Sequence, residues 1–306
     1  MRLFSVTIKP FLKWAGGKTQ LLPRLTEKLP TEMKFGATKR YAEPFLGGGA
    51  VFFHLAQLFA VREFWLSDIN KDIILCYQTV RHDVRGVMAL LDEMQARYRQ
   101  ASVIEQEQMF YDIRTQFNDD LAAMDFAHYS QAWLNRAAQI IFLNHTCFNG
   151  LFRVNAKGLF NVPCGKYPNP TLYDKNNLLE VAALLQDTHI QCGDFTSCQN
   201  FVDEQTFCYF DPPYRPLNKT ASFTSYAKFD FTDDSQRRLA GFFRQLDRRG
   251  AKLMLSNSDP KNENPQDDFF EKLYQDFNIS QVQALRAINS NGKKRGAVSE
   301  LIITNY

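Results

Sequence analysis

The stretch RYAEPFLGGGAVFFHLA, residues 40–56, decides the fold class. It starts as a short strand-forming run, passes through a glycine turn and continues as an apolar segment with helical character. A second apolar run, EFWL at residues 63–66, follows and is tipped by Asp68. A strand, a glycine turn, a helix and another strand of this total length are typical of a βαβ unit in a parallel sheet. The sequence therefore predicts an α/β protein.

Apolar runs elsewhere in the chain predict further strands of the same sheet. Residues 188–192, 206–210 and 251–255 have strand character, and each leads into a polar turn. Near the C-terminal end, residues 279–288 and 298–304 flank a basic loop. Two strand-like runs around such a loop indicate a closing antiparallel pair.

The amino-acid composition of the chain changes between these groups of strands. From about residue 71 to residue 139 it is charged, rich in leucine and glutamine, and spaced as helices are. Strand-like segments lie on both sides of this region. We therefore expect one α/β domain, residues 1–70 and 174–306, interrupted by a mainly helical domain, residues 71–173.

A hairpin is predicted near the end of the inserted region. The alternating runs LFRV, residues 151–154, and LFNV, residues 159–162, flank a turn that contains Asn155 and Gly158. Two such runs around an Asn-and-Gly turn are typical of a β-hairpin.

Composition limits the classes of function. The chain has 306 residues, 45% of them apolar and 23% charged, which is ordinary globular usage. A net charge of +3 is compatible with a polyanionic partner without requiring one. The 6 cysteines form no C-x-x-C pair and the 5 histidines are scattered, so no metal site is predicted. No signal peptide or long apolar span is evident, and we expect a soluble cytoplasmic protein with reduced thiols.

The glycine turns exclude two nucleotide sites. Gly17-Lys18-Thr19 has the end of a P-loop, but Leu12 stands where the leading glycine is required. In the second turn, Phe52 stands where a dinucleotide fingerprint has its third glycine, which disfavours NAD. The surviving possibility is a smaller adenosyl ligand.

Three residues of the βαβ unit are suited to such a ligand. Gly47 and Gly49 would let the backbone approach it closely, and Asp68 could accept both ribose hydroxyls. Taken alone, the glycines also fit an ordinary strand-to-helix turn, and Asp68 also fits a helix N-cap.

The tetrapeptide Asp211-Pro212-Pro213-Tyr214 closes the apolar run 206–210. Strand ends of this kind carry the chemistry of open α/β sheets. One carboxylate acceptor and one aromatic face within four residues are suited to gripping a flat heterocycle that carries an amino group.

Taken in order, these motifs resemble the Dam family of DNA adenine-N6 methyltransferases, of the D12 class and α group. The resemblance spans nearly the entire chain. Its segments are residues 13–18, 43–49, 68, 143–163, 193–195, 211–214, 286–292 and 300–306. It implies a Rossmann-like S-adenosylmethionine-dependent methyltransferase sheet with an inserted, mainly helical DNA-recognition domain.

The resemblance also implies how S-adenosylmethionine would be held. An ammonium and an indole would lie beside its methionine part, glycines and an aromatic ring under it, and carboxylates at its ribose and adenine. The matching cofactor-binding residues are Trp14, Lys18, Phe45, Gly47, Gly49, Asp68, Asp194, Phe195 and Asp211.

The tetrapeptide has a chemical rationale of its own. The N6 lone pair of adenine is delocalised into the ring, so hydrogen-bond acceptors must draw its protons out of plane. We hypothesise that the Asp211 carboxylate and the Pro212 carbonyl are those acceptors. Pro213 fixes the turn and Tyr214 stacks on the base, which must first be flipped out of the duplex. The methyl group then passes to nitrogen by in-line displacement, without a metal.

DNA recognition is likewise implied by the resemblance, which predicts duplex DNA and the target GATC. Arg153 matches a guanine-reading arginine, an arginine fork being the commonest contact to guanine. Lys13 matches a contact to the outer guanine. The other matches are Phe148 and Asn149, which enter the duplex, and Leu151 and Pro163, which touch thymine. Residues 215–228 and the basic run 293–295 are candidate phosphate contacts.

Two alternatives remain open from sequence. A cytosine-N4 methyltransferase uses the same amino-group logic on a smaller ring. A sequence-specific DNA-binding protein that has lost catalysis would keep the recognition region. We expect a monomer in a bacterial cell or phage-infected host, with or without a companion restriction nuclease.

Overall fold

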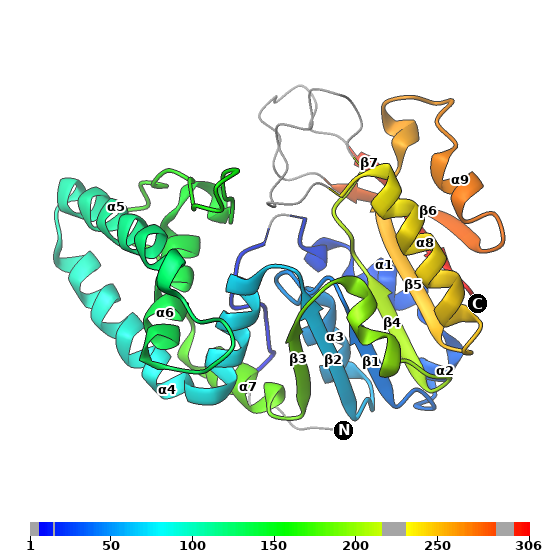
Figure 1. The fold of residues 1–306 in the computed structure, drawn as a ribbon, viewed down its shortest axis with the longest axis horizontal. Coiled ribbons are helices and arrows are strands. Elements are labelled where there is room, and N and C mark those ends of the chain that lie inside the picture. Colours follow the sequence, from blue (N-terminus) through cyan, green and yellow to red (C-terminus); the bar gives the residue numbers. More distant parts are fainter. Residues whose placement is uncertain (1–5, 15, 216–230, 286–296) are drawn as a thin grey trace.

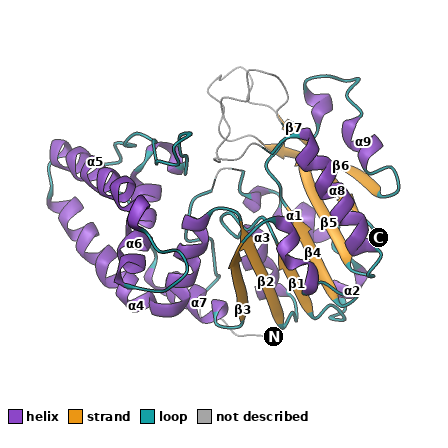
Figure 2. Ribbon diagram, in the orientation of Figure 1, coloured by secondary structure: helices purple, strands orange, loops and turns teal. Residues whose placement is uncertain are grey.

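The computed structural model describes residues 6–14, 16–215, 231–285 and 297–306. Within these ranges seven strands form one sheet, in the order β3-β2-β1-β4-β5-β7-β6 (Figures 1 and 2). The strands are β1 (Arg40–Glu43), β2 (Glu63–Asp68), β3 (Thr188–Cys192), β4 (Thr206–Phe210), β5 (Lys252–Ser258), β6 (Asn278–Leu285) and β7 (Ala297–Thr304). The predicted α/β methyltransferase fold is confirmed.

The predicted βαβ unit is present. β1 pairs in parallel with β2, and the helix α3 (Ala50–Leu58) connects them. β1 also pairs in parallel with β4 on its other side. The chain thus leaves β1 toward one side of the sheet and returns on the other. The carboxyl ends of β1 and β4 are where such a sheet binds ligands.

The far edge of the sheet is antiparallel, as predicted. β7 lies between β5 and β6 and pairs antiparallel with both. The basic run 293–295 and the motif 286–292 lie outside the described residues, as does most of the predicted loop 215–228.

Helices cover both faces of the sheet (Figure 1). Alternate residues of β4 enter two separate cores, Phe207 and Tyr209 one of them and Cys208 and Phe210 the other. The first core includes α3, and the second includes α8 (Asp233–Asp247). Burial on both faces explains why β4 is a continuous apolar run instead of an alternating one. The remaining sheet-side helices are α1 (Leu22–Glu27), α2 (Thr31–Lys34), α7 (Lys175–Leu185) and α9 (Phe269–Leu273).

The predicted helical insertion is present as α4 (Lys71–Gln100), α5 (Val103–Asp119) and α6 (Gln131–Thr146), drawn at the left of Figure 1. α4 starts directly after β2, because the Asn70 side chain caps it by accepting from the amides of Asp72 and Ile73. Arg136 of α6, 1% exposed, joins the three helices by donating to Asp72 Oδ1 and to the Phe117 carbonyl. Among the described residues, no helix combines the length and apolar composition needed to cross a membrane.

The β-hairpin predicted at residues 151–162 is wrong in its extent. The structure has only an isolated bridge between Val154 and Phe160, with a second between Cys147 and Cys164. The reason is competition for backbone groups. The next pairing position on this strand is Pro163, which has no amide proton, and its carbonyl accepts from the Phe148 amide instead of from Leu151. Asn118 of α5 accepts from the outward-facing Phe160 amide and donates to its carbonyl, which braces the segment from the side. The segment, here called the recognition loop (residues 147–164), is an irregular loop braced by helices.

Candidate active site

The carboxyl ends of the central strands bring acidic side chains together. Glu43 ends β1, Asp68 ends β2 and Asp211 follows β4. Glu43 is 2% exposed, and the Tyr41 hydroxyl donates to its Oε2 at 2.6 Å. Burial raises the pKa of Glu43 to about 8, and the charges of Asp211 and Asp68 add to that rise. A neutral Glu43 adds no third negative charge between the other two carboxylates. Sequence reasoning had quoted Glu43 only as part of a motif.

Asp211 is held by a lysine that the sequence did not link to it. The Lys18 ammonium, 4% exposed, lies 2.7 Å from Asp211 Oδ1, and Ser256 of β5 donates to the same oxygen at 3.2 Å. Burial raises the pKa of Asp211, whereas the Lys18 charge and both hydrogen bonds lower it. Tyr209 lies within 2.7 Å of the Ser256 hydroxyl and extends the chain of hydrogen bonds. The arrangement favours an Asp211 carboxylate that accepts hydrogen bonds.

Tyr214 is fixed from the edge of the sheet. Its hydroxyl donates to Glu300 Oε2 at 2.6 Å, and Glu300 lies in β7 opposite Ser258 of β5. Its ring centroid lies 4.7 Å from the Lys18 ammonium. Burial and the nearby acidic groups raise the pKa of Tyr214 well above its usual value, so it stays a neutral donor. Glu300 and Lys18 together fix the orientation of the Tyr214 ring, and so the position of the face on which a base could stack.

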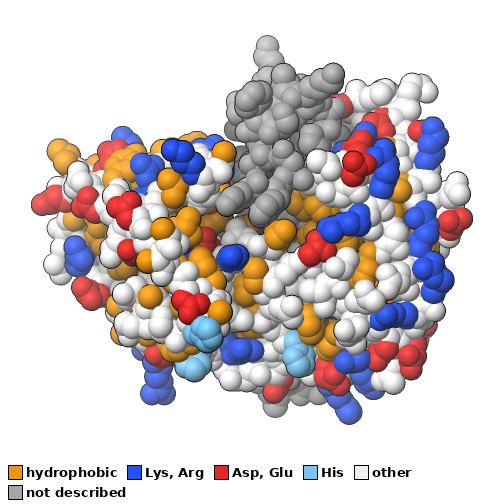
Figure 3. Space-filling view, in the orientation of Figure 1, with side chains coloured by type: hydrophobic (Ala, Val, Ile, Leu, Met, Phe, Trp, Pro, Cys, Tyr) orange, Lys and Arg blue, Asp and Glu red, His pale blue; other side chains and the backbone are white. Residues whose placement is uncertain are grey.

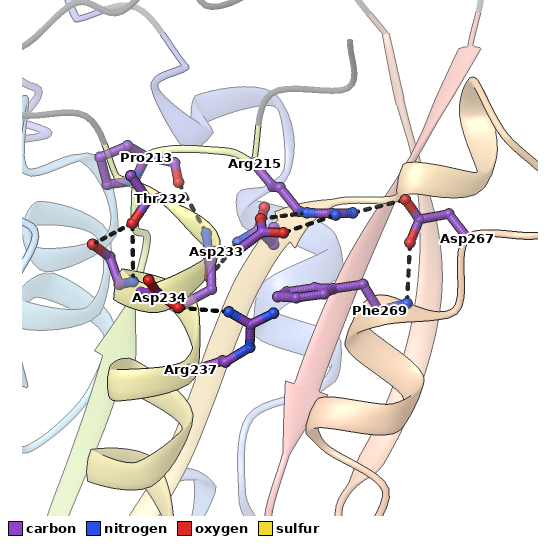
Figure 4. A network of polar contacts seen from close by, with 11 residues as sticks. Pro213, Arg215, Thr232, Asp233, Asp234, Arg237, Asp267 and Phe269 are labelled. Carbon is purple, nitrogen blue, oxygen red and sulfur yellow. Dashed lines mark hydrogen bonds and ion pairs between the residues drawn. The ribbon is translucent and has the colours of Figure 1, made fainter. Parts of the chain in front are cut away.

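The chain beyond Tyr214 is anchored by Arg215 (Figure 4). Its Nε and Nη2 donate to both carboxylate oxygens of Asp233 at 2.7 and 3.1 Å. Its Nη1 donates to Asp267 at 2.7 Å, and its guanidinium lies 4.2 Å from the Phe269 ring centroid. On the other side of Tyr214, Gln236 donates to the Pro213 carbonyl. The tetrapeptide is therefore tied to α8 before and after its tyrosine.

The glycine turn holds an indole. Gly47 and Gly49 have φ of +47° and +70°, conformations that favour glycine. A Cβ on Gly47 would lie 2.7 Å from Trp14 Nε1, and one on Gly48 would lie 2.9 Å from Trp14 Cβ. The indole also stacks on Phe152 at 5.8 Å. The need for glycine at Gly47 thus has a cause inside the protein, beyond the expected approach of a ligand.

Asp68 ties the end of β2 to this turn. Its Oδ2 accepts from the Gly47 amide and its Oδ1 from the Asn70 amide, both at 2.9 Å. Burial raises the pKa of Asp68, and these backbone hydrogen bonds lower it. The N-cap interpretation is wrong, because Asn70 caps α4. Each carboxylate oxygen retains capacity for a further hydrogen bond.

Asp194 and Phe195 are matched to the adenine of the cofactor, and Phe45 is matched to the turn under it. Phe45 stacks on Phe195, with ring centroids 5.6 Å apart. Asp194 accepts from the Thr196 amide and forms an ion pair with Arg238 of α8. The Arg238 guanidinium also lies 4.5 Å from the Phe195 ring centroid. No sequence motif marks Arg238 as a partner of these residues.

The residues matched to DNA lie on the recognition loop or beside it. Phe148 is 51% exposed, and Asn149 is exposed with φ of +56°. Arg153 is half-buried, and its Nε donates to Asn161 Oδ1 at 2.8 Å, a partner that sequence reasoning missed. The others are Lys13 and Pro163, both exposed, and Leu151, half-buried. Most of these side chains are exposed, whereas Glu43, Asp68 and Asp211, here called the acidic sheet edge, are buried or half-buried. The Trp14 indole lies against both Gly47 and Phe152 of the loop.

Charge on the surface is mixed. In Figure 3, lysines and arginines are interspersed with aspartates and glutamates across the visible face. Within the described ranges, no group of His, Cys, Asp or Glu side chains gathers as a metal ion would require.

Comparisons with known proteins point in one direction. A family model described as D12 class N6 adenine-specific DNA methyltransferase matches residues 14–288. The chain is 50% identical over 300 residues to the Type II methyltransferase M.MjaIII of Methanocaldococcus jannaschii, covering 98% of this chain and 99% of that protein. It is 36% identical to the Type II methyltransferase M1.LlaDCHI of Lactococcus lactis subsp. cremoris, covering 99% and 97%. It is 32% identical to the DNA adenine methylase of Escherichia coli K12, covering 96% and 94%.

Proposed function

The chain belongs to the D12 class of N6 adenine-specific DNA methyltransferases, and from this membership we propose that it methylates a flipped adenine within GATC. The family resemblance predicted from the sequence is confirmed. As a family member the chain acts on DNA and requires a methyl donor, and N6 of adenine is its target class. The proposal adds the donor, the recognition sequence and the extrahelical base.

The geometry at Asp211 is the observation that carries the proposed chemistry. Lys18 and Ser256 both bind Oδ1, and among the described residues no bond to Oδ2 is found. This leaves Oδ2 available to accept one amino proton of an adenine, and we assign the other amino proton to the Pro212 carbonyl. Charge held in position before the reaction lowers a barrier more than charge that must reorganise. Tyr214, pinned by Glu300, supplies the stacking surface.

The residues matched to S-adenosylmethionine fit that molecule by their chemistry. When bound, it supplies an electrophilic methyl group. The partly exposed ring of Phe45, backed by the buried Phe195, offers an aromatic face for an adenine ring, and Asp68 has acceptor capacity left for ribose hydroxyls. Of the three donors of Lys18, one serves Asp211 and one the Gly16 carbonyl, which leaves one for a carboxylate.

We assign sequence recognition to residues 71–173, with the rest of the chain as the catalytic domain. Support comes from the recognition loop, whose exposed side chains are braced by α5 and α6. Asn161 orients the Arg153 guanidinium, and an oriented fork reads guanine better than a free one. The fixed turn at Phe148 and Asn149 presents an aromatic ring of the kind that enters a duplex.

Transfer of a labelled methyl group to paired duplexes tests the proposal. One duplex carries GATC and the other the same bases permuted. We expect incorporation only in the first, recovered after digestion as N6-methyladenine. Equal incorporation would reject GATC, and recovery as N4-methylcytosine would restore the cytosine alternative.

Base flipping has a separate test. With 2-aminopurine in place of the target adenine, binding should raise its fluorescence, because an unstacked base is no longer quenched by its neighbours. An unchanged signal on saturating binding would contradict flipping without touching the specificity.

A further inference from the structure

The N-terminal segment 8–13 is held by side-chain amides from three helices. Gln57 of α3 accepts from the Ile8 amide and donates to its carbonyl. Asn177 of α7 makes the same two bonds to Lys9. Asn144 of α6 makes them to Lys13, at 2.7 and 2.9 Å. A two-point grip of this kind imitates strand pairing and fixes both position and orientation of the backbone.

Asn144 differs from the other two amides in what else it binds. It is 1% exposed, and its Nδ2 also donates to the Gly150 carbonyl at 3.1 Å. Both amide protons are thus used, one on Lys13 and one on the recognition loop. Asn144 is the joint between the segment that carries Lys13 and the turn that carries Phe148 and Asn149.

Packing at the joint is close. Gly150 has φ of +62°, and a Cβ there would lie 2.5 Å from Lys13 Cδ and 2.9 Å from Lys13 Cβ. The lysine stem therefore lies directly against the glycine. On the far side of the turn, the Phe148 amide donates to the Pro163 carbonyl, and the Asn149 amide donates to the Tyr167 hydroxyl. The turn therefore contacts the Lys13 stem on one side and is hydrogen-bonded on the other.

We propose that Asn144 is a positioning residue for sequence discrimination, which sets the Lys13 ammonium at a fixed distance from the recognition loop. The inference rests on the proposed function, because it takes Lys13 as a guanine contact. Asn144 itself is too buried to touch DNA. Loss of its grip should weaken one guanine contact selectively and leave the acidic site at Asp211 unchanged.

Replacing each guanine of the GATC duplex in turn by 7-deazaguanine tests this, because the analogue lacks the N7 acceptor. We expect the wild-type kcat/KM to fall by about tenfold at each guanine. For Lys13→Ala, we expect the 7-deazaguanine replacement to leave kcat/KM unchanged at one of the two guanines only. For Asn144→Ser, the replacement should leave kcat/KM unchanged at that same guanine and should still lower it at the other. The variant should bind S-adenosylmethionine as the wild type does.

Asn177→Ser is the matched control, since it removes the same two-point grip from Lys9 and should keep both sensitivities. If Asn144→Ser does not fold, Gly150→Ala displaces the lysine stem while leaving Asn144 intact, and should give the same selective loss. Retention of both sensitivities in Asn144→Ser or Gly150→Ala overturns the inference. A wild type indifferent to both guanines refutes the proposed GATC readout, and an unaffected Lys13→Ala refutes the role of Lys13.

Discussion

The acidic sheet edge and the recognition loop hold their polar side chains in place in opposite ways. At the sheet edge, parallel strands end together and charged groups such as Lys18 and Asp211 are buried against one another. In the recognition loop, exposed side chains stand on a backbone with two isolated bridges, held by side-chain amides such as those of Asn118 and Asn144. Charges count most where water is excluded, so changes at the sheet edge should act on rate and those at the loop on choice of sequence.

The largest effect should follow Asp211→Asn, which keeps the shape and removes the charge. We expect methyl transfer to fall by roughly a thousandfold, as when a preorganised group is lost from an active site, while DNA affinity stays near that of the wild type. Single-turnover transfer and a binding titration measure the two. Asp203→Asn is the control, because Asp203 pairs with Arg40 at the opposite end of β4. Near-normal turnover in Asp211→Asn would show that the Asp211 carboxylate is not needed for methyl transfer.

Glu43 makes the buried region sensitive to pH. Its pKa in the folded chain is about 8 against an ordinary 4.5, so the folded state retains a proton that the unfolded chain loses. Its contribution to stability is complete below pH 4.5 and is lost as pH rises through about 8. Glu43→Gln mimics the neutral acid and should be more stable than the wild type by roughly 2–4 kcal/mol at pH 8, with little difference at pH 4.5. Urea unfolding across that range measures it, and parallel curves would contradict a protonated Glu43.

The recognition loop should give a smaller and more selective effect. Arg153→Ala is expected to lose about 1–3 kcal/mol of discrimination at one guanine, the usual worth of a good base contact. The rate on the preferred duplex at saturating DNA should change little. Competition between GATC and singly altered duplexes measures the loss. Asn161→Ala, which frees the Arg153 guanidinium, should show the same pattern more weakly. If Arg153→Ala still discriminated between GATC and the singly altered duplexes as the wild type does, another residue would have to read that guanine.

Sequence predicted the sheet edge better than the loop because strand ends follow from periodicity. The sequence predicts both Thr188–Cys192 and Thr206–Phe210 with their full bounds. In the second of these strands, burial on both faces leaves an unbroken apolar run. The acidic residues that end such runs must then share one edge. Partners from distant segments carry no such signal. Glu300 lies 86 residues from Tyr214, and nothing local marks it as the acceptor of that hydroxyl.

The prediction of a β-hairpin at residues 151–162 failed for a related reason. Alternation around Asn155 and Gly158 predicted a ladder, and the local turn is indeed present, with the Asn155 amide bonded to the Leu159 carbonyl. Whether a ladder grows beyond its turn depends on which groups compete for the backbone. Here the ladder stops at Pro163, which has no amide proton and whose carbonyl is bound by the Phe148 amide, a contact that alternation does not predict.

The smallest effect should come from the contacts that anchor the chain just beyond Tyr214, in which Arg215 binds Asp233 and Asp267 (Figure 4). Arg215→Lys keeps the charge but cannot bind both oxygens of Asp233 and also reach Asp267, because an ammonium lacks the planar fork. We expect kcat to fall by about tenfold through a loosened Tyr214, an effect of about 1.4 kcal/mol. Arg237→Lys is the matched control, since Arg237 makes one exposed ion pair with Asp234 on the same helix and should change kcat less than about twofold. Equal behaviour of the two variants would mean that the exit of the tetrapeptide needs only a positive charge, and that Tyr214 is held by Glu300 and Lys18 alone.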